Sequence, residues 1–374
     1  MFHDHKKEIC LYLDDVWEEA KNERARVFGL LRAAKYTCLF GAGEIGRAVA
    51  YELADAGLKA DSFCDNNSEL WGKTITQNIS CISPHQLVID KDDTRVLITT
   101  GYFRQVRAQL ESLGITDLLM VPKLMIRNSQ YLDRVSCASV QENLCRLIDI
   151  LNDEESKRVL SVIVRNWFGR SDSLHTYGDV ATFDQYFPPE IISLSEHEVF
   201  IDAGAFNGDT LTNFLSHVRN RFLHAIAYEL DKTCYRQLQG VIQGMNAAVK
   251  ERITAYNLGL YDTNGHVSYI DNATSSSINS SAGRQGRVVR LDDHLAGATV
   301  TFIKMDIEGA EINALRGAER TLTSSVPKLA ISVYHQPAHI WEVPLLLKKL
   351  VPDYRIYLRH HSTQEFETVC YAVL

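Results

Sequence analysis

The chain has 374 residues, enough for two domains, and its 45% hydrophobic and 23% charged residues are ordinary for a globular protein. A formal net charge of −8 and the lack of a basic run argue against nucleic acid as a general partner. No apolar run approaches the ~20 residues that cross a bilayer, and the N-terminus lacks the apolar core of a signal peptide. The eight cysteines form no C-x-x-C pair, so neither a zinc ribbon nor a disulfide framework is indicated. We therefore expect a cytoplasmic protein without a membrane span.

Two kinds of pattern fill the N-terminal third of the chain. Residues 1–34 carry apolar side chains at helical spacing among charged ones and predict one or two amphipathic helices. Residues 35–125 then alternate short apolar strands with helices, which predicts a Rossmann-like domain.

A complete G-x-G-x-x-G motif follows the first strand of that domain and opens a helix. Its glycines are Gly41, Gly43 and Gly46, and a second strand ends at Asp65, where a carboxylate can bind a ribose. The motif is typical of a nucleotide site, but it also fits a fold whose glycines only permit close helix–strand packing. An NAD-dependent or nucleotide-sugar-dependent enzyme centred on these glycines is therefore one alternative function. A non-catalytic ligand-binding protein is the other.

A helical segment joins the two halves of the chain over residues 126–198. Apolar side chains at helical spacing predict helices over 140–152 and 153–167, and these could pair two chains in a homodimer. The polar loop 171–189, dotted with aromatic residues, is either a lid over a neighbouring site or a plain connector.

The stretch VFIDAGAFNGD, residues 199–209, predicts a second nucleotide-type turn. A buried strand ends near Asp202, Gly204 and Gly208 bracket a tight turn, and a helix begins. About twenty residues further on, an apolar run ends in Glu229, which can accept hydrogen bonds from both hydroxyls of a ribose. The turn lacks the full dinucleotide motif, and a helix N-terminus serves a carboxylate as well as a phosphate. This combination suits S-adenosylmethionine better than a dinucleotide.

Charged residues cluster at the end of a later strand, in the stretch VTFIKMDIEGAE of residues 300–311. Lys304, Asp306 and Glu308 alternate, so they are expected on one face of the extended chain. The next strand ends in His335, which is expected near Asp306 and Glu308 because parallel strands end at one edge of the sheet. A histidine between two carboxylates can act as a general base or bind a divalent cation.

Three more elements are predicted in this half. The turn Thr263-Asn264-Gly265 predicts a hairpin over residues 259–270. A helix is expected over 311–322. Strands over 354–359 and 367–373 are expected to close the sheet as an antiparallel pair.

Several segments of residues 145–374 resemble the FkbM-type methyltransferases. They are FIDAGAFNGDT, AYELD, LDDHL and TFIKMDIEGAEINALRGAERTL, followed by a strand that ends in histidine; LNDEESKRVL and DQYFPPEII resemble the two-domain members. Many members carry a glutamate just before that histidine, and this chain has none between Ile331 and Tyr334. The resemblance implies a class I methyltransferase fold over 199–374 and S-adenosylmethionine-dependent O-methylation, often of a sugar or polyketide hydroxyl. The whole chain is then an α/β protein with two Rossmann-like, doubly wound domains joined by a helical linker.

The residue pattern and the resemblance together predict roles for individual residues. The cofactor would be held at its methionine end by the glycine turn, at its ribose by Glu229 and near its adenine by Asn257; the turn residues are Asp202, Gly204, Asn207 and Gly208. The acceptor, a small molecule or carbohydrate, would lose its proton to Asp306, Glu308 or His335 beside Lys304, directly or through a divalent metal bound by the first three.

Overall fold

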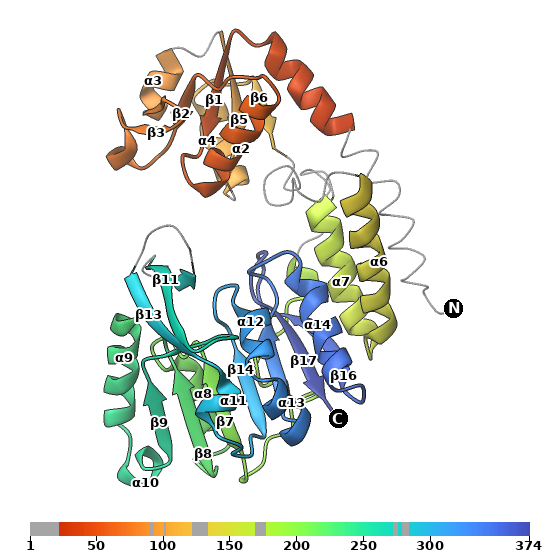
Figure 1. Cartoon of the computed structure of the whole chain (residues 1–374). Coiled ribbons are helices and arrows are strands. Elements are labelled where there is room, and N and C mark those ends of the chain that lie inside the picture. Colours follow the sequence, from red (N-terminus) through yellow and green to blue (C-terminus); the bar gives the residue numbers. More distant parts are fainter. Residues whose placement is uncertain are drawn as a thin grey trace. The chain divides into compact units, whose positions relative to one another are not determined.

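The computed structural model describes residues 22–89, 93–100, 102–121, 134–168, 177–271, 276–278 and 284–374. The described residues fall into two compact units (Figure 1). The first lies within Lys7–Glu142 and Val164–His175, and the second within Asn143–Ile163 and Thr176–Leu374. The predicted linker 126–198 therefore divides between the two units. Of the predicted N-terminal helices, residues 22–33 are helical and residues 1–21 lie outside the described part.

The N-terminal unit contains a six-stranded sheet in the order β3-β4-β2-β1-β5-β6. All neighbouring strands are parallel except β3 and β4. The strands are β1 (Tyr36–Phe40), β2 (Ser62–Cys64), β3 (Thr74–Thr76), β4 (Ile79–Ile82), β5 (Thr94–Ile98) and β6 (Leu118–Met120). The helices are α2 (Glu44–Asp55), α3 (Pro84–Ile89), α4 (Phe103–Ser112) and a 3₁₀ turn, η1 (Ser68–Leu70).

Both faces of this sheet are buried. Along β1, Leu39 belongs to one apolar cluster, whereas Cys38 and Phe40 belong to another. Successive side chains of a strand point to opposite faces, so the two clusters cover the two faces of the sheet. The Rossmann-like fold expected for this part of the chain is confirmed.

The helices α6 (Arg134–Ile150) and α7 (Glu154–Phe168) follow. Asp153 caps α7, because its Oδ1 accepts the Ser156 N–H at 2.8 Å. Its Oδ2 also forms an ion pair with Nη2 of Arg359 at 2.7 Å. The Ser156 hydroxyl oxygen accepts the Leu358 N–H at 2.9 Å. These contacts fix the start of α7 to the strand β16 (Arg355–His360) in the C-terminal unit.

The C-terminal unit contains a seven-stranded sheet in the order β16-β17-β15-β14-β7-β8-β9. Strand β17 is antiparallel to both of its neighbours, and the other neighbouring pairs are parallel. The closing antiparallel pair expected from the sequence is thus confirmed. The strands besides β16 are β7 (Val199–Ala203), β8 (His224–Tyr228), β9 (Ile253–Tyr256), β14 (Phe302–Met305), β15 (Lys328–Ser332) and β17 (Thr368–Val373).

Helices cover both faces of this sheet (Figure 1). They are η4 (Tyr177–Asp179), α8 (Asp209–His217), α9 (Lys232–Gln243), α10 (Ala247–Lys250), α11 (Leu291–His294), α12 (Glu311–Arg316), α13 (Glu319–Ser325) and α14 (His339–Leu350). Four buried phenylalanines join the sheet to α8 and to the segment before β7, with ring centroids 4.3 to 6.3 Å apart: Phe187, Phe200, Phe214 and Phe302.

Two elements differ from the sequence prediction. The hairpin over 259–270 is wrong: β10 (Gly259–Leu260) and β11 (Gly265–Asp271) do not pair with each other. Both pair with β13 (Arg284–Val289), in a small sheet of order β10-β13-β11-β12 that ends with β12 (Ser276–Ile278). The side chain of Asn264 instead binds the Arg290 N–H and the carboxylate of Asp293.

The single helix predicted over 311–322 is two helices, α12 and α13, separated at Gly317. A Cβ on Gly317 would lie 2.0 Å from the main-chain oxygen of Tyr261, so the chain passes too close here for any other residue. The helix is broken by this contact with a distant segment, which the local spacing of apolar residues does not reveal.

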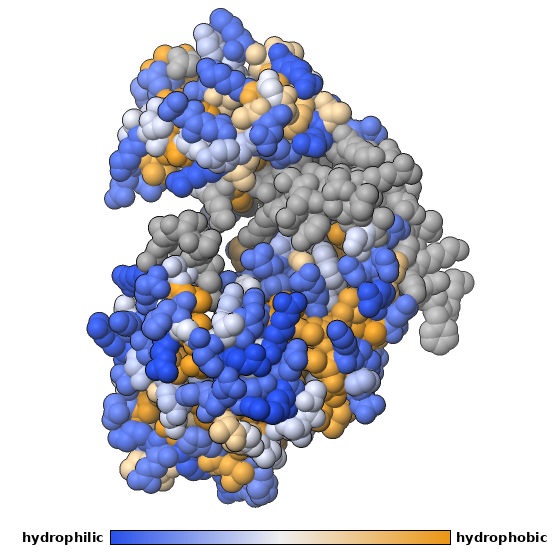
Figure 2. All heavy atoms as spheres, viewed as in Figure 1, coloured by the Kyte–Doolittle hydropathy of each residue, from blue (hydrophilic) through white to orange (hydrophobic). Residues whose placement is uncertain are grey.

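The described helices are all too short or too polar to cross a membrane. Hydrophilic residues make up much of the visible surface of each unit (Figure 2). The apolar side chains of α6 and α7 that suggested a homodimer, such as Leu144, Leu147 and Leu160, are buried within the chain.

Candidate functional site

The turn after β7 has a backbone that requires glycine. Gly204 has a φ of +74°, and a Cβ there would lie 1.8 Å from the main-chain oxygen of Asp306. Gly208 has a φ of +92° and starts α8. Because β7 lies between β14 and β8, the turn sits where three parallel strands end, which is the edge where open α/β sheets bind ligands.

Glu229 follows β8 at the same edge. Its Oε2 accepts the Phe206 N–H at 2.8 Å, and its Oε1 accepts the Asp231 N–H at 2.7 Å. Burial raises the pKa of this carboxyl to about 7, although the two N–H groups act to lower it. Each oxygen keeps a lone pair for a further donor, as a pair of ribose hydroxyls would require.

Lys304 and Asp202 form a buried ion pair beneath the glycine turn. The ammonium of Lys304 lies 3.1 Å from Oδ1 of Asp202 and donates to the main-chain oxygen of Gly204 at 2.7 Å. Burial raises the pKa of Asp202 and acts to lower that of Lys304, but the charges of Asp202 and Asp306 raise the Lys304 pKa overall. Asp202 is completely buried, so it supports the turn rather than touching a ligand in the open site.

The two asparagines selected from the sequence serve the backbone. Oδ1 of Asn207 accepts the Asp209 N–H at 3.1 Å, and the residue lines an adjoining groove between α8 and α9 rather than the main cavity. Nδ2 of Asn257 donates to the main-chain oxygens of Glu229 at 2.8 Å and Leu230 at 2.9 Å. Asn257 thus holds the loop that carries Glu229.

Asp306 is surrounded by hydroxyl groups. Its Oδ2 accepts the Tyr186 hydroxyl at 2.7 Å, and its Oδ1 lies 3.4 Å from the Tyr334 hydroxyl. Tyr186 comes from the segment before β7, has a φ of +72°, and its ring lies under the ammonium of Lys304 at 5.2 Å. Sequence reasoning noted Tyr186 only as part of a polar loop and did not identify Tyr334 as a site residue.

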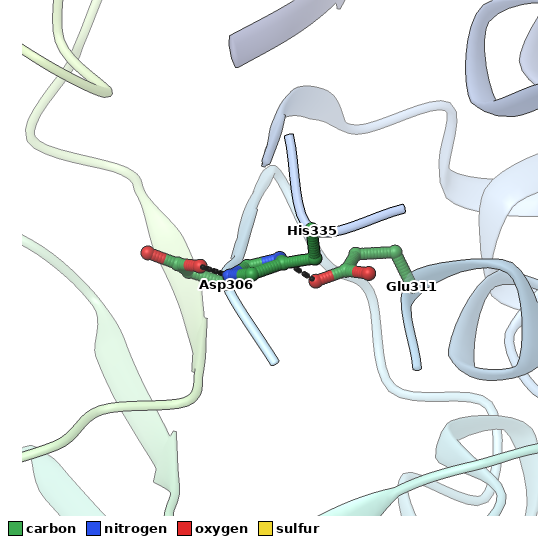
Figure 3. Close-up of side chains that lie close together, drawn as sticks. All are labelled: Asp306, Glu311 and His335. Atoms are coloured by element: carbon green, nitrogen blue, oxygen red, sulfur yellow. Dashed lines mark hydrogen bonds and ion pairs between the residues drawn. The ribbon is translucent and has the colours of Figure 1, made fainter. Parts of the chain in front are cut away.

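His335 lies where the sequence predicts it, beside Asp306 and Glu308. Its Nε2 is 3.3 Å from Oδ1 of Asp306 and 3.4 Å from Oε2 of Glu308. Its Nδ1 donates to Oε1 of Glu311 at 2.9 Å, so the imidazole lies between two carboxylates (Figure 3). Glu308 has a φ of +56°, a conformation that few residues other than glycine adopt and that often marks functional sites.

Glu311 is a functional candidate that sequence reasoning missed. It is completely buried, and its Oε2 lies 3.1 Å from Nδ1 of His339. Burial acts to raise its pKa, but the two histidines hold that pKa well below its ordinary value. The signal was present in the sequence as the last residue of the stretch 300–311, but only the fold brings His339 to it.

The same carboxylates act on the protonation of His335. Burial acts to lower its pKa, but the hydrogen bond to Glu311 and the charges of Glu311, Asp306 and Glu308 raise it to about 9. Without another cation present, His335 is therefore protonated at neutral pH. One possible metal-ligand atom from each of Asp306, Glu311 and His335 lies within 4.8 Å of the other two.

A cavity of about 590 Å³ is lined by Gly204, Glu229, Asp306 and Glu308, whereas His335 and Glu311 are not among its lining residues. Its wall contains the glycine turn, Glu229, the loop 258–260 and the ends of β14 and β15. It also contains one lysine, Lys304, and six acidic side chains: Asp184, Asp209, Glu229, Asp306, Glu308 and Glu367. Part of the predicted lid, residues 184–186, forms one side of it.

Packing accounts for two of the three glycines of the motif in the N-terminal unit. A Cβ on Gly41 would lie 2.8 Å from the main-chain oxygen of Thr99, and a Cβ on Gly46 would lie 1.9 Å from that of Gly41. Asp65 accepts the Ala42 N–H at 2.8 Å and the Asn67 N–H at 2.8 Å. By contrast, a Cβ on Gly43 would meet no atom within 4 Å.

Comparisons with known proteins agree with this geometry. Residues 202–364 match the model of the methyltransferase FkbM domain. The methyltransferase FkbM of Methylobacillus flagellatus KT, at 22% identity, aligns with 97% of this chain and 100% of its own, with a TM-score of 0.69. A search of curated proteins found no significant match.

Shorter structures align with about half of the chain. An rRNA methylase from Streptococcus thermophilus covers 48% of this chain and 87% of its own, with 13% identity and a TM-score of 0.30. The fibrillarin of Aeropyrum pernix, solved with bound S-adenosyl-L-methionine, covers 49% and 70%, with 13% identity and a TM-score of 0.30. The C-terminal unit has the class I methyltransferase fold, and its residues 202–364 match the methyltransferase FkbM domain.

Proposed function

We propose that the chain transfers a methyl group from S-adenosylmethionine to a hydroxyl group of a sugar or another small polar acceptor. The observation that carries this proposal is the cavity itself, where the turn at Gly204, the carboxylate of Glu229 and the acidic group around Asp306 share one wall. A methyltransferase needs its cofactor site and its proton-accepting groups within one space.

The residues of the cavity fit this cofactor in chemical kind. Glu229 can accept two ribose hydroxyls, and Leu258 and Leu260 offer apolar surface for an adenine ring. The sulfonium of S-adenosylmethionine is a cation, and six carboxylates against one lysine favour a cation. The same charges would repel the diphosphate of a dinucleotide, which argues against an NAD-type ligand in this cavity.

The acceptor hydroxyl must lose a proton as its oxygen attacks the methyl carbon and the carbon–sulfur bond breaks. The cavity offers Asp306 and Glu308 as proton acceptors, with His335 held as a cation between them and Glu311. The Tyr186 hydroxyl fixes one oxygen of Asp306. The raised pKa of His335 leaves its ring charged at neutral pH, so the proposed base is Asp306 or Glu308 rather than His335.

The test has two stages on the full chain. Calorimetric titration with S-adenosylhomocysteine is expected to give one site, and titration with NAD is expected to give no heat from the C-terminal cavity. Label transfer from methyl-labelled S-adenosylmethionine into a small-molecule extract of the producing cells then identifies the acceptor by mass spectrometry.

The variant Asp306→Asn separates binding from chemistry. We expect its cofactor affinity to stay within about threefold of wild type and its transfer rate to fall by about 10²- to 10⁴-fold, as for loss of a general base. Full activity in Asp306→Asn would remove this residue from the mechanism. A wild-type chain that binds no S-adenosylhomocysteine would contradict the proposed function itself.

A further inference from the structure

Two carboxylate oxygens approach the same imidazole nitrogen where β14 and β15 finish. Nε2 of His335 lies 3.3 Å from Oδ1 of Asp306 and 3.4 Å from Oε2 of Glu308. Neither contact has hydrogen-bond geometry, so among the described residues Nε2 is a buried nitrogen without a hydrogen-bond partner. We infer that Asp306, Glu308 and His335 form a binding site for one divalent cation.

The imidazole is held in the orientation that such a site needs. Nδ1 of His335 donates to Oε1 of Glu311 at 2.9 Å, which leaves Nε2 to face Asp306 and Glu308. Histidine ligands of metals usually donate their other ring N–H to a carboxylate or a carbonyl in this way.

Glu311 holds the ring rather than the cation. Its Oε1 also accepts the N–H groups of Ile307 at 3.1 Å and Gly309 at 3.3 Å, and its Oε2 faces Nδ1 of His339 at 3.1 Å. Glu311 is completely buried, and its Oε1 already accepts three N–H groups, from His335, Ile307 and Gly309.

Asp306 and Glu308, by contrast, are open to the cavity. Their side chains are 21% and 33% exposed, which lets an ion enter from solvent and leaves coordination positions free for an acceptor oxygen. Two carboxylates with one imidazole suit first-row divalent cations such as Mn²⁺ and Zn²⁺.

The role of this cation rests on the proposed function. A cation bound to the acceptor hydroxyl would lower the pKa of that hydroxyl, so that its oxygen attacks the methyl carbon as the carbon–sulfur bond breaks. The hydroxyl proton then passes to a cavity carboxylate outside the ligand set, such as Glu367. Asp306 and Glu308 act through the cation in this version of the reaction.

Calorimetric titration of the full, chelator-treated chain with MnCl₂ and with ZnCl₂ tests the site. We expect one cation per chain, at least tenfold weaker binding in Glu308→Gln and His335→Gln, and about 10- to 100-fold weaker binding in Glu311→Gln, where only the orientation is lost. The matched control is Glu251→Gln, which removes an exposed carboxylate outside the cavity and leaves cation affinity unchanged. Thermal melts confirm that each variant is folded, and Glu308→Gln, the more exposed ligand, stays informative if His335→Gln unfolds.

Anomalous scattering from crystals soaked in MnCl₂ is expected to place the ion between the three donor atoms. The inference is overturned if neither cation binds below millimolar concentration, or if both ligand variants bind as tightly as wild type. Titration of the same samples with S-adenosylhomocysteine keeps the two proposals apart. Cofactor binding without cation binding refutes the metal site alone, and cation binding without cofactor binding refutes the proposed function alone.

Discussion

Gly204 leaves no room for a side chain because the β14 strand end passes directly beside it. An added Cβ would meet the main-chain oxygen of Asp306. This oxygen cannot move without also shifting the carboxylate of Asp306. Gly204, which shapes the turn after β7, therefore also fixes the position of Asp306, the proposed base.

Substitution of this glycine tests that link. Gly204→Ala combines a left-handed φ with a backbone clash and is expected to cost about 3 kcal/mol or more of unfolding free energy. The control Gly240→Ala lies in α9, where no atom is within 4 Å of an added Cβ, and it should gain about 0.5 to 1 kcal/mol. Urea unfolding measures both; equal stability of the two variants would contradict the geometry.

If Glu229 binds the cofactor ribose as proposed, its titration makes cofactor binding depend on pH. Its pKa of about 7 means that the carboxyl is largely protonated below neutrality and cannot accept both ribose hydroxyls. Affinity for S-adenosylhomocysteine is therefore expected to be full above pH 7 and to fall by about tenfold per unit as the pH drops below it. Calorimetry across this range measures the slope, and Glu229→Gln should bind weakly at every pH. A flat wild-type profile would show that Glu229 does not bind the ligand in its ionised form.

The first part of α7, from the predicted linker, belongs to the C-terminal unit. Asp153 caps this helix and also pairs with Arg359 of β16, whose side chain is only 5% exposed. Loss of the Asp153 cap on α7 and loss of a carboxylate partner of the buried Arg359 guanidinium should each destabilise the unit.

Asp153→Ala is expected to cost about 2 kcal/mol, from the lost cap and from the loss of the nearer of two carboxylate partners of Arg359, the other being Glu190 at 3.5 Å. Glu155→Ala, which removes a partly exposed pair with Arg158 from the same helix turn, should cost about 0.5 kcal/mol or less. Calorimetric unfolding of the full chain compares the two. Similar losses would mean that the contact to β16 contributes little.

The sequence predicted elements well where local pattern decides them. The strands leading to Gly204, Glu229, Asp306 and His335 each follow from an apolar run, and parallel pairing alone brings their ends to one edge. Predictions failed where a distant segment intervenes. The hairpin around Asn264 gave way to pairing of both strands with β13, and the helix after Glu311 breaks at Gly317 against Tyr261. No local pattern encodes such contacts.

At the scale of the whole chain, each of the two Rossmann-like units contains the same hydrogen-bonding arrangement beside its glycine turn. Asp65 and Glu229 each accept an N–H from the preceding turn and another from the residue two positions ahead. The two units differ in what surrounds this acidic side chain. In the C-terminal unit it borders the acidic cavity, whereas Gly41 and Gly46 of the N-terminal unit are accounted for by backbone packing. The better-matching glycine motif is thus not by itself the better evidence for a ligand.

The crystal structure of the full chain soaked with S-adenosylhomocysteine is the most direct test of the central claim. The account predicts one molecule per chain, with its ribose hydroxyls on Glu229 and its sulfur toward Asp306. Ligand bound at Gly41–Gly46 instead, or a C-terminal cavity that stays free of ligand at saturating concentration, would contradict it.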